Sequence, residues 1–127
     1  MNNGERTTHN EDIMIYIGFS THTHRLYARI FCKTFKHCAP VVVIGNKCSL
    51  YQFVNKNHIQ KININIRDLK ILEHYDWTFI KYNSKNAPRN AETIPAITCV
   101  QFTKKFCCIN KKRILTPDDL FRYLNTK

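Results

Sequence analysis

The segment HCAPVVVIGNKCSLYQFV, residues 37–54, decides how this chain folds. Its first half, His37 to Ile44, is an almost continuous apolar run, which is typical of a strand at the centre of a sheet. Gly45-Asn46 is a turn signal, and the run from Cys48 to Val54 predicts the antiparallel partner strand. The sequence therefore predicts a central hairpin with the other elements arranged around it.

Three further segments predict strands beside this hairpin. Ile13 to Phe19 is a short apolar run rich in branched residues, and Ile59 to Ile66 alternates strictly between polar and apolar residues. Trp77 to Tyr82 is a third candidate, whereas Leu69 to Tyr75 fits either a helix or a turn. The polar stretch from Asn83 to Glu92 predicts a mobile loop.

Helices are predicted toward both ends of the chain. Apolar spacing between Arg25 and Phe35 indicates a short amphipathic helix. Thr98 is a good N-cap for a helix from Cys99 to Ile109, and Thr116-Pro117 begins a last helix. The predicted class is α+β, with an antiparallel sheet of about four or five strands packed against an N-terminal helix and C-terminal helices.

Length and composition predict one domain. The chain has 127 residues, of which 43% are hydrophobic, and this is enough for one compact core. Residues 1–12 are polar and lack the apolar core of a signal peptide, so we expect a disordered lead-in followed by a single domain at 13–127. Without a secretion signal, the cysteines suggest a reducing compartment, and we expect a cytoplasmic protein.

The charge balance is strongly basic. Twenty Lys and Arg against nine Asp and Glu give a net charge of +11. Such a surface attracts an anionic polymer or membrane, but the positive residues are scattered and no aromatic RNA-binding signature accompanies them, so nucleic acid is not favoured as a partner. No CxxC occurs, and the adjacent pair Cys107-Cys108 has poor geometry for zinc. We expect neither a metal nor a cofactor.

Cys99 and His37 are the candidates for chemistry. Cys99 follows an N-cap, so it lies in the first helical turn, where the helix dipole favours a thiolate. His37 begins the central strand, which would hold its ring rigidly at the edge of the sheet. A thiolate beside an imidazole is an activated nucleophile. The alternative for each residue is structural: Cys99 packs under the sheet, and His37 is a surface residue beside Lys36.

A third residue should orient the imidazole. A two-residue turn at Gly45-Asn46 would place Gln52 on the same face as His37, diagonally across the ladder, and its amide oxygen can accept a proton from imidazole. A longer turn would bring Asn55 or Tyr51 to that position instead.

The motifs FKHCAPVVVIG and TCVQFTKKFCCI, in this order, resemble those of permuted papain-like proteins. That superfamily includes NlpC-type hydrolases and lecithin:retinol acyltransferase-like enzymes. In it a His begins a strand, a polar residue follows on the next strand, and a Cys begins a C-terminal helix, so His37 matches the first position and Cys99 the last. The end of the chain looks most like short phage or bacterial members. Many members have a second His about a dozen residues after the first, whereas this chain has none there.

The resemblance implies a circularly permuted papain-like fold and a thiol hydrolase or acyltransferase. The bond attacked would be an amide, thioester or ester, and peptidoglycan peptides or protein amides are possible substrates. Two rivals are a basic nucleic-acid or protein-binding module without chemistry and a degenerate papain-like scaffold. Catalysis requires the helix from Cys99 to pack across the strand His37 to Ile44, with Val100, Phe102 and Phe106 against its valines.

Overall fold

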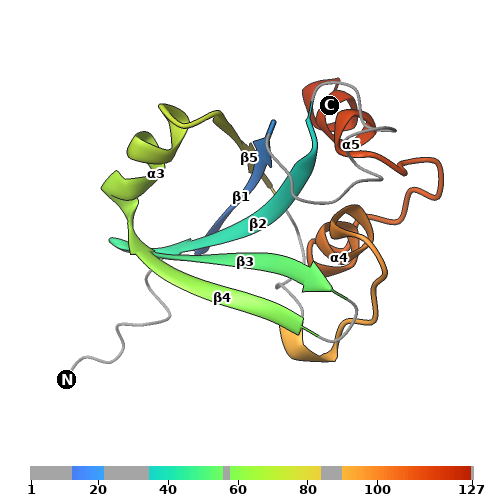
Figure 1. Cartoon of the computed structure of the whole chain (residues 1–127), viewed down its shortest axis with the longest axis horizontal. Helices are drawn as coiled ribbons and strands as arrows, with labels where there is room; N and C mark the ends of the chain where they lie inside the picture. Colours follow the sequence, from blue (N-terminus) through green and yellow to red (C-terminus); the bar gives the residue numbers. More distant parts are fainter. Residues whose placement is uncertain (1–12, 22–34, 56–57, 84–89, 127) are drawn as a thin grey trace.

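The computed structural model describes residues 13–21, 35–55, 58–83 and 90–126 (Figure 1). The predicted lead-in at 1–12 and all but the last residue of the helix expected from Arg25 to Phe35 lie outside the described residues. Phe35 itself is in an irregular segment that leads into the central strand.

The described residues form an α+β structure with one five-stranded antiparallel sheet. Its strand order is β4-β3-β2-β1-β5. The strands are β1 (Ile13–Ser20), β2 (His37–Ile44), β3 (Lys47–Asn55), β4 (His58–Asn65) and β5 (Trp77–Tyr82). Three α-helices, α3 (Ile66–Glu73), α4 (Cys99–Phe106) and α5 (Pro117–Asn125), and the 3₁₀ helix η1 (Ala91–Thr93) accompany them. The predicted α+β class and antiparallel sheet are confirmed, and β2 is its middle strand.

Two elements end earlier than the sequence pattern predicted. The strand expected to reach Ile66 ends at Asn65, whose backbone N–H donates to Asp68 Oδ2 at 2.9 Å and caps α3. The helix expected to reach Ile109 ends at Phe106, because Cys108 has a φ of 60° and leaves the helical conformation. A capping hydrogen bond ends the strand, and a positive φ ends the helix, although the apolar pattern continues beyond both points.

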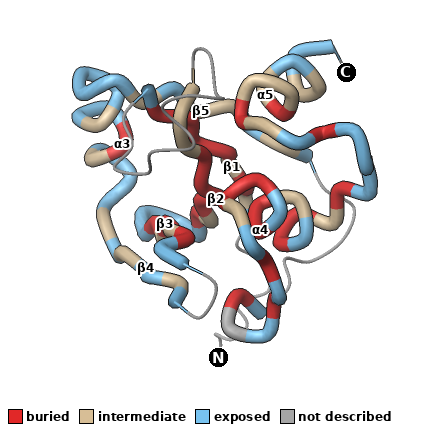
Figure 2. The backbone as a smooth tube through the Cα atoms, turned by 45° about the vertical axis from the view of Figure 1, so that its right-hand side comes forward, coloured by how far each residue is buried: buried red, intermediate tan, exposed pale blue. Residues whose placement is uncertain are grey.

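The two faces of the sheet bury separate clusters of side chains. α4 and α5 lie to one side of the sheet and α3 to the other, as Figure 1 shows. On the α4 side, Val100, Phe102 and Phe106 pack with side chains of β1 and β3, and the buried residues gather between this helix and the strands (Figure 2). The second cluster joins Leu69 of α3 to side chains of β2 and β3.

The expected packing of α4 on the valines of β2 is wrong in detail. Val41 and Val43 belong to the cluster around Leu69, on the other face, and only Val42 packs against the cluster of α4. Side chains of a strand alternate between faces, so neighbouring valines cannot all meet one helix. α4 contacts β2 instead through Cys38.

α5 anchors the segment that enters β2. Phe121 packs against Phe19 of β1 and Phe35, with ring centroids 5.3 and 4.8 Å away. The Phe35 backbone N–H donates to Asp118 Oδ1 at 3.1 Å, and the Lys36 N–H donates to the Ser20 carbonyl at 2.8 Å. These contacts fix the backbone immediately before His37.

Candidate functional site

Cys99 is the first residue of α4, as the sequence pattern predicted. The Thr98 side chain accepts a hydrogen bond from the Gln101 N–H at 3.1 Å, which caps the helix. Cys99 is only 8% exposed, while the neighbouring Ile97 is 69% exposed. The thiol is therefore sheltered, but it lies next to the surface and at the positive end of the helix dipole.

His37 is the first residue of β2 and pairs with Ser20 of β1. Its ring meets that of Trp77 edge-on, with the centroids 6.1 Å apart. The Nε2 atom is buried and forms no hydrogen bond with the residues that the structure describes. His37 is at the end of the sheet, where a side chain can contact groups from both faces.

The fold brings Cys99 and His37 together although 62 positions (99 − 37) separate them in the sequence. The imidazole lies close enough to Cys99 to lower the pKa of its thiol, together with Cys38. This proximity follows from the packing of α4 on β2.

A second thiol, which the sequence analysis did not single out, completes the site. Cys38 Sγ lies 3.9 Å from Cys99 Sγ and 3.6 Å from Thr103 Oγ1, within hydrogen-bond range for sulfur. Cys38 is 1% exposed and Thr103 is fully buried. The S–H of Cys38 points at groups on the same face of α4, because positions four apart on a helix are neighbours.

The two thiols have opposite acidities. The hydrogen bond from Cys38 is the strongest influence on the pKa of Cys99 and, with the His37 imidazole and the Cys38 backbone, holds it well below its usual value despite burial. Burial and the neighbouring Cys99 raise the pKa of Cys38 well above its usual value. Burial also raises the pKa of Cys107 to about 12. Cys99 is thus the more acidic thiol of the pair, and Cys38 donates the hydrogen bond between them.

Within the described residues, His37 Nε2 has no hydrogen-bond partner, so Gln52 does not bind that atom. The predicted register is confirmed from Val41–Leu50 to Ile44–Lys47, but the recorded β2–β3 pairing extends no further toward His37. On the other edge of β3, Gln52 is opposite Gln60 of β4. Its role as an orienting residue stays a prediction.

The two alternatives to Gln52 also lie on β3. Tyr51 packs on Phe106, with ring centroids 5.0 Å apart, and therefore contributes to the core under α4. Asn55 lies at the end of the strand, beside a register shift, and is exposed. Trp77, the first residue of β5, contacts the imidazole, and no sequence pattern indicated this contact.

Sequence reasoning could have found Thr103 but not Cys38. Thr103 is four residues after Cys99, and this spacing places the two on one helix face. Cys38 follows His37 on a strand, so alternation predicts that the two side chains point to opposite faces. Only the position of α4 over Cys38 shows that both residues can approach the same sulfur.

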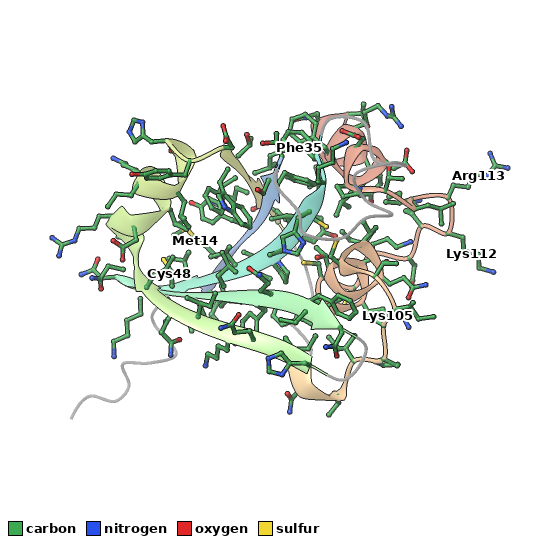
Figure 3. The ribbon with its side chains drawn as sticks, viewed as in Figure 1. Met14, Phe35, Cys48, Lys105, Lys112 and Arg113 are labelled. Atoms are coloured by element: carbon green, nitrogen blue, oxygen red, sulfur yellow. The ribbon has the colours of Figure 1, made fainter. Side chains whose placement is uncertain are left out.

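The basic residues near the end of α4 are partly engaged in the structure. Lys104 Nζ donates to the carbonyls of Lys111 and Ile114 at 2.8 and 2.7 Å, and Lys105 Nζ donates to the Pro95 carbonyl at 2.7 Å. These bonds tie α4 to the loops on either side. Lys112 and Arg113 project outward from the loop that joins α4 to α5 (Figure 3).

Neither a metal cluster nor a membrane-spanning helix is present in the described ranges. No group of three or more His, Cys, Asp and Glu side chains there is placed to hold a metal ion. Each described helix is too short or too polar to cross a bilayer. In comparisons with known proteins, no family model, no curated protein and no solved structure matches this chain.

Proposed function

We propose that this protein is a cysteine-dependent hydrolase or acyltransferase with Cys99 as nucleophile and His37 as its base, on a permuted papain-like fold. The observation that carries the proposal is a thiol in the first turn of a helix, 3.9 Å from the thiol of the residue after His37, with the imidazole near enough to lower the pKa of Cys99. Helix dipole, imidazole and a donating thiol all favour the thiolate, which is the nucleophilic form of cysteine.

The reaction proceeds through a thioester. His37 holds the proton released from Cys99, and the thiolate attacks the carbonyl carbon of an amide, thioester or ester. The backbone N–H of Cys99 is in the first turn of α4 and serves as one donor to the oxyanion. His37 returns its proton to the leaving group, and water or another acceptor then releases the acyl group from sulfur.

The order of motifs supports the papain-like part of the proposal. A strand begins with His, a hairpin follows, and a Cys begins a helix near the C-terminus. Peptidoglycan peptides and protein amides fit the NlpC-type side of this resemblance, and acyl esters fit the acyltransferase side. Ile97, exposed beside the nucleophile, would contact an apolar part of either substrate.

Selective alkylation tests the proposed nucleophile. Near pH 6, iodoacetamide should modify Cys99 much faster than Cys107, because only Cys99 keeps a thiolate population at that pH while the pKa of Cys107 is about 12. Trypsin separates the thiols, since the peptide 90–104 contains Cys99 alone and 106–111 contains Cys107 and Cys108. Mass spectrometry of both peptides over time gives the two rates.

The contribution of the imidazole has a matched control. His37→Ala should slow the alkylation of Cys99, because it removes the hydrogen bond and the charge that lower its pKa. His58→Ala changes an exposed histidine on β4 and should leave the rate unchanged. Equal rates for Cys99 and Cys107, or equal effects of the two histidine variants, would remove the basis for an activated thiol.

A second candidate function is a basic binding module, favoured by the exposed Lys112 and Arg113 (Figure 3). If polyanion binding is the function, reversing Lys111, Lys112 and Arg113 to Glu should abolish binding to duplex DNA or heparin. The log–log salt slope of the unmodified chain should then be about −0.9 for each DNA phosphate contacted. We expect the unmodified chain to bind these polyanions only weakly. In the charge-reversed variant, we expect the rate of Cys99 alkylation to be unchanged. Salt-dependent tight binding, with Cys99→Ala silent in every assay, would favour the module.

A further inference from the structure

The site contains two cysteine thiols, Cys38 and Cys99, that face each other. Cys38 comes from β2 and Cys99 from α4, and their sulfur atoms are 3.9 Å apart. A disulfide has an S–S length of about 2.05 Å, so the two side chains together need to close a gap of about 1.9 Å. All five described cysteines are free thiols, and this pair is the one joined by a thiol–thiol hydrogen bond among them.

The members of the pair are chemically unequal, as a nucleophile and a resolving thiol must be. Cys99 is the first residue of α4, accepts the hydrogen bond from Cys38 and has a pKa below the usual range, so it ionises before Cys38, and thiolates are the form that peroxides oxidise. Cys38 keeps its proton and is 1% exposed, so peroxide meets Cys99 first. Thr103 Oγ1, 3.6 Å from Cys38 Sγ, holds the second sulfur beside the first.

We propose that Cys38 is the resolving cysteine of Cys99, and that a Cys38–Cys99 disulfide protects the nucleophile reversibly from a hydroperoxide. The Cys99 thiolate attacks the outer oxygen of the hydroperoxide and the O–O bond breaks, so Cys99 becomes a sulfenic acid. The leaving oxygen takes the proton that His37 holds and departs as an alcohol or water. Cys38 sulfur then attacks the Cys99 sulfur, the S–O bond breaks, and the hydroxyl leaves as water with the Cys38 proton.

This inference deepens the proposed function, because it assigns a regulation to the same thiol. The oxidised protein has no free nucleophile, and a dithiol reductant restores both thiols. Without the resolving thiol, the sulfenic acid would proceed to sulfinic and sulfonic acids, which such reductants do not reverse. A packing role for Cys38, as a small buried hydrophobe, predicts none of this chemistry.

The test is a disulfide map of the full chain after brief treatment with hydrogen peroxide. Trypsin yields residues 37–47 with Cys38 alone, 90–104 with Cys99 alone and 48–56 with Cys48 alone. The expected product is a cross-link between 37–47 and 90–104 that dithiothreitol cleaves. The readout needs no substrate, so it succeeds or fails independently of the hydrolase proposal.

Two variants sharpen the result. Cys38→Ser should abolish the cross-link and let Cys99 accumulate as sulfinic and sulfonic acid; Cys38→Ala serves the same purpose if the serine variant fails to fold. Cys48→Ser is the matched control, because Cys48 is buried in the other cluster, and it should behave as the unmodified chain does. The proposal is overturned if the unmodified chain over-oxidises at Cys99 without the cross-link, or if Cys99 joins the peptide 106–111 instead.

Discussion

Replacing Cys99 with Ala should reduce the turnover of an activated acyl substrate by at least about 10³-fold, as the loss of a nucleophile does in other acyl-transfer enzymes. p-Nitrophenyl acetate is a suitable probe, because it needs no specific binding site. The unmodified chain should show a burst of p-nitrophenol and carry an acetyl group on the peptide 90–104.

The variants at histidine complete this experiment. His37→Ala should lower turnover by about 10²–10⁴-fold, the usual contribution of a general base. His58→Ala, which changes an exposed histidine, should retain the full rate. Circular dichroism of each variant confirms that it is folded. If Cys99→Ala keeps the acetyl burst, or acetyl groups appear on 48–56 or 106–111 instead, Cys99 is not the nucleophile.

Phe102→Ala should destabilise the protein by about 3–5 kcal/mol, the usual cost of truncating a buried aromatic residue. Phe102 is fully buried between Phe53 of β3 and Phe106, with ring centroids 6.3 and 5.8 Å away. The substitution leaves a cavity under α4, the helix that holds the nucleophile. Urea unfolding of the variant should show a lower midpoint with an unchanged slope.

An exposed aromatic residue provides the control for Phe102. Tyr75 is 67% exposed in the turn after α3, so Tyr75→Ala should change stability by no more than about 0.5 kcal/mol. Equal midpoints for the two variants would show that α4 does not depend on this core contact. The packing described for the site would then be wrong.

Several elements could be predicted because their signals are local. The apolar run His37 to Ile44 and the segment Trp77 to Tyr82 are strands with the predicted bounds. Thr98 and Thr116 cap helices through their own side chains, which hydrogen-bond to backbone N–H groups three residues later. The β2–β3 register also follows from a short-range signal, the two-residue turn at Gly45-Asn46.

The conformation of the segment after β4 could not be predicted from neighbouring residues alone. Leu69 fits a helix or a turn by its neighbours, and it becomes part of α3 because it can bury against Val41 and Val43. Those valines were expected to face α4. Which face of a two-sided strand meets which helix depends on where each helix lies in space, and neighbouring residues do not encode that position.

The sequence by itself determined the candidate nucleophile and base, because a helix start and a strand start are local features with readable signals. Only the tertiary structure decided that His37 comes near enough to Cys99 to lower the pKa of its thiol, and that Cys38 stands 3.9 Å from Cys99. The physical reason is that a contact across 62 positions is fixed by how α4 packs on β2, and that packing depends on the whole apolar core at once.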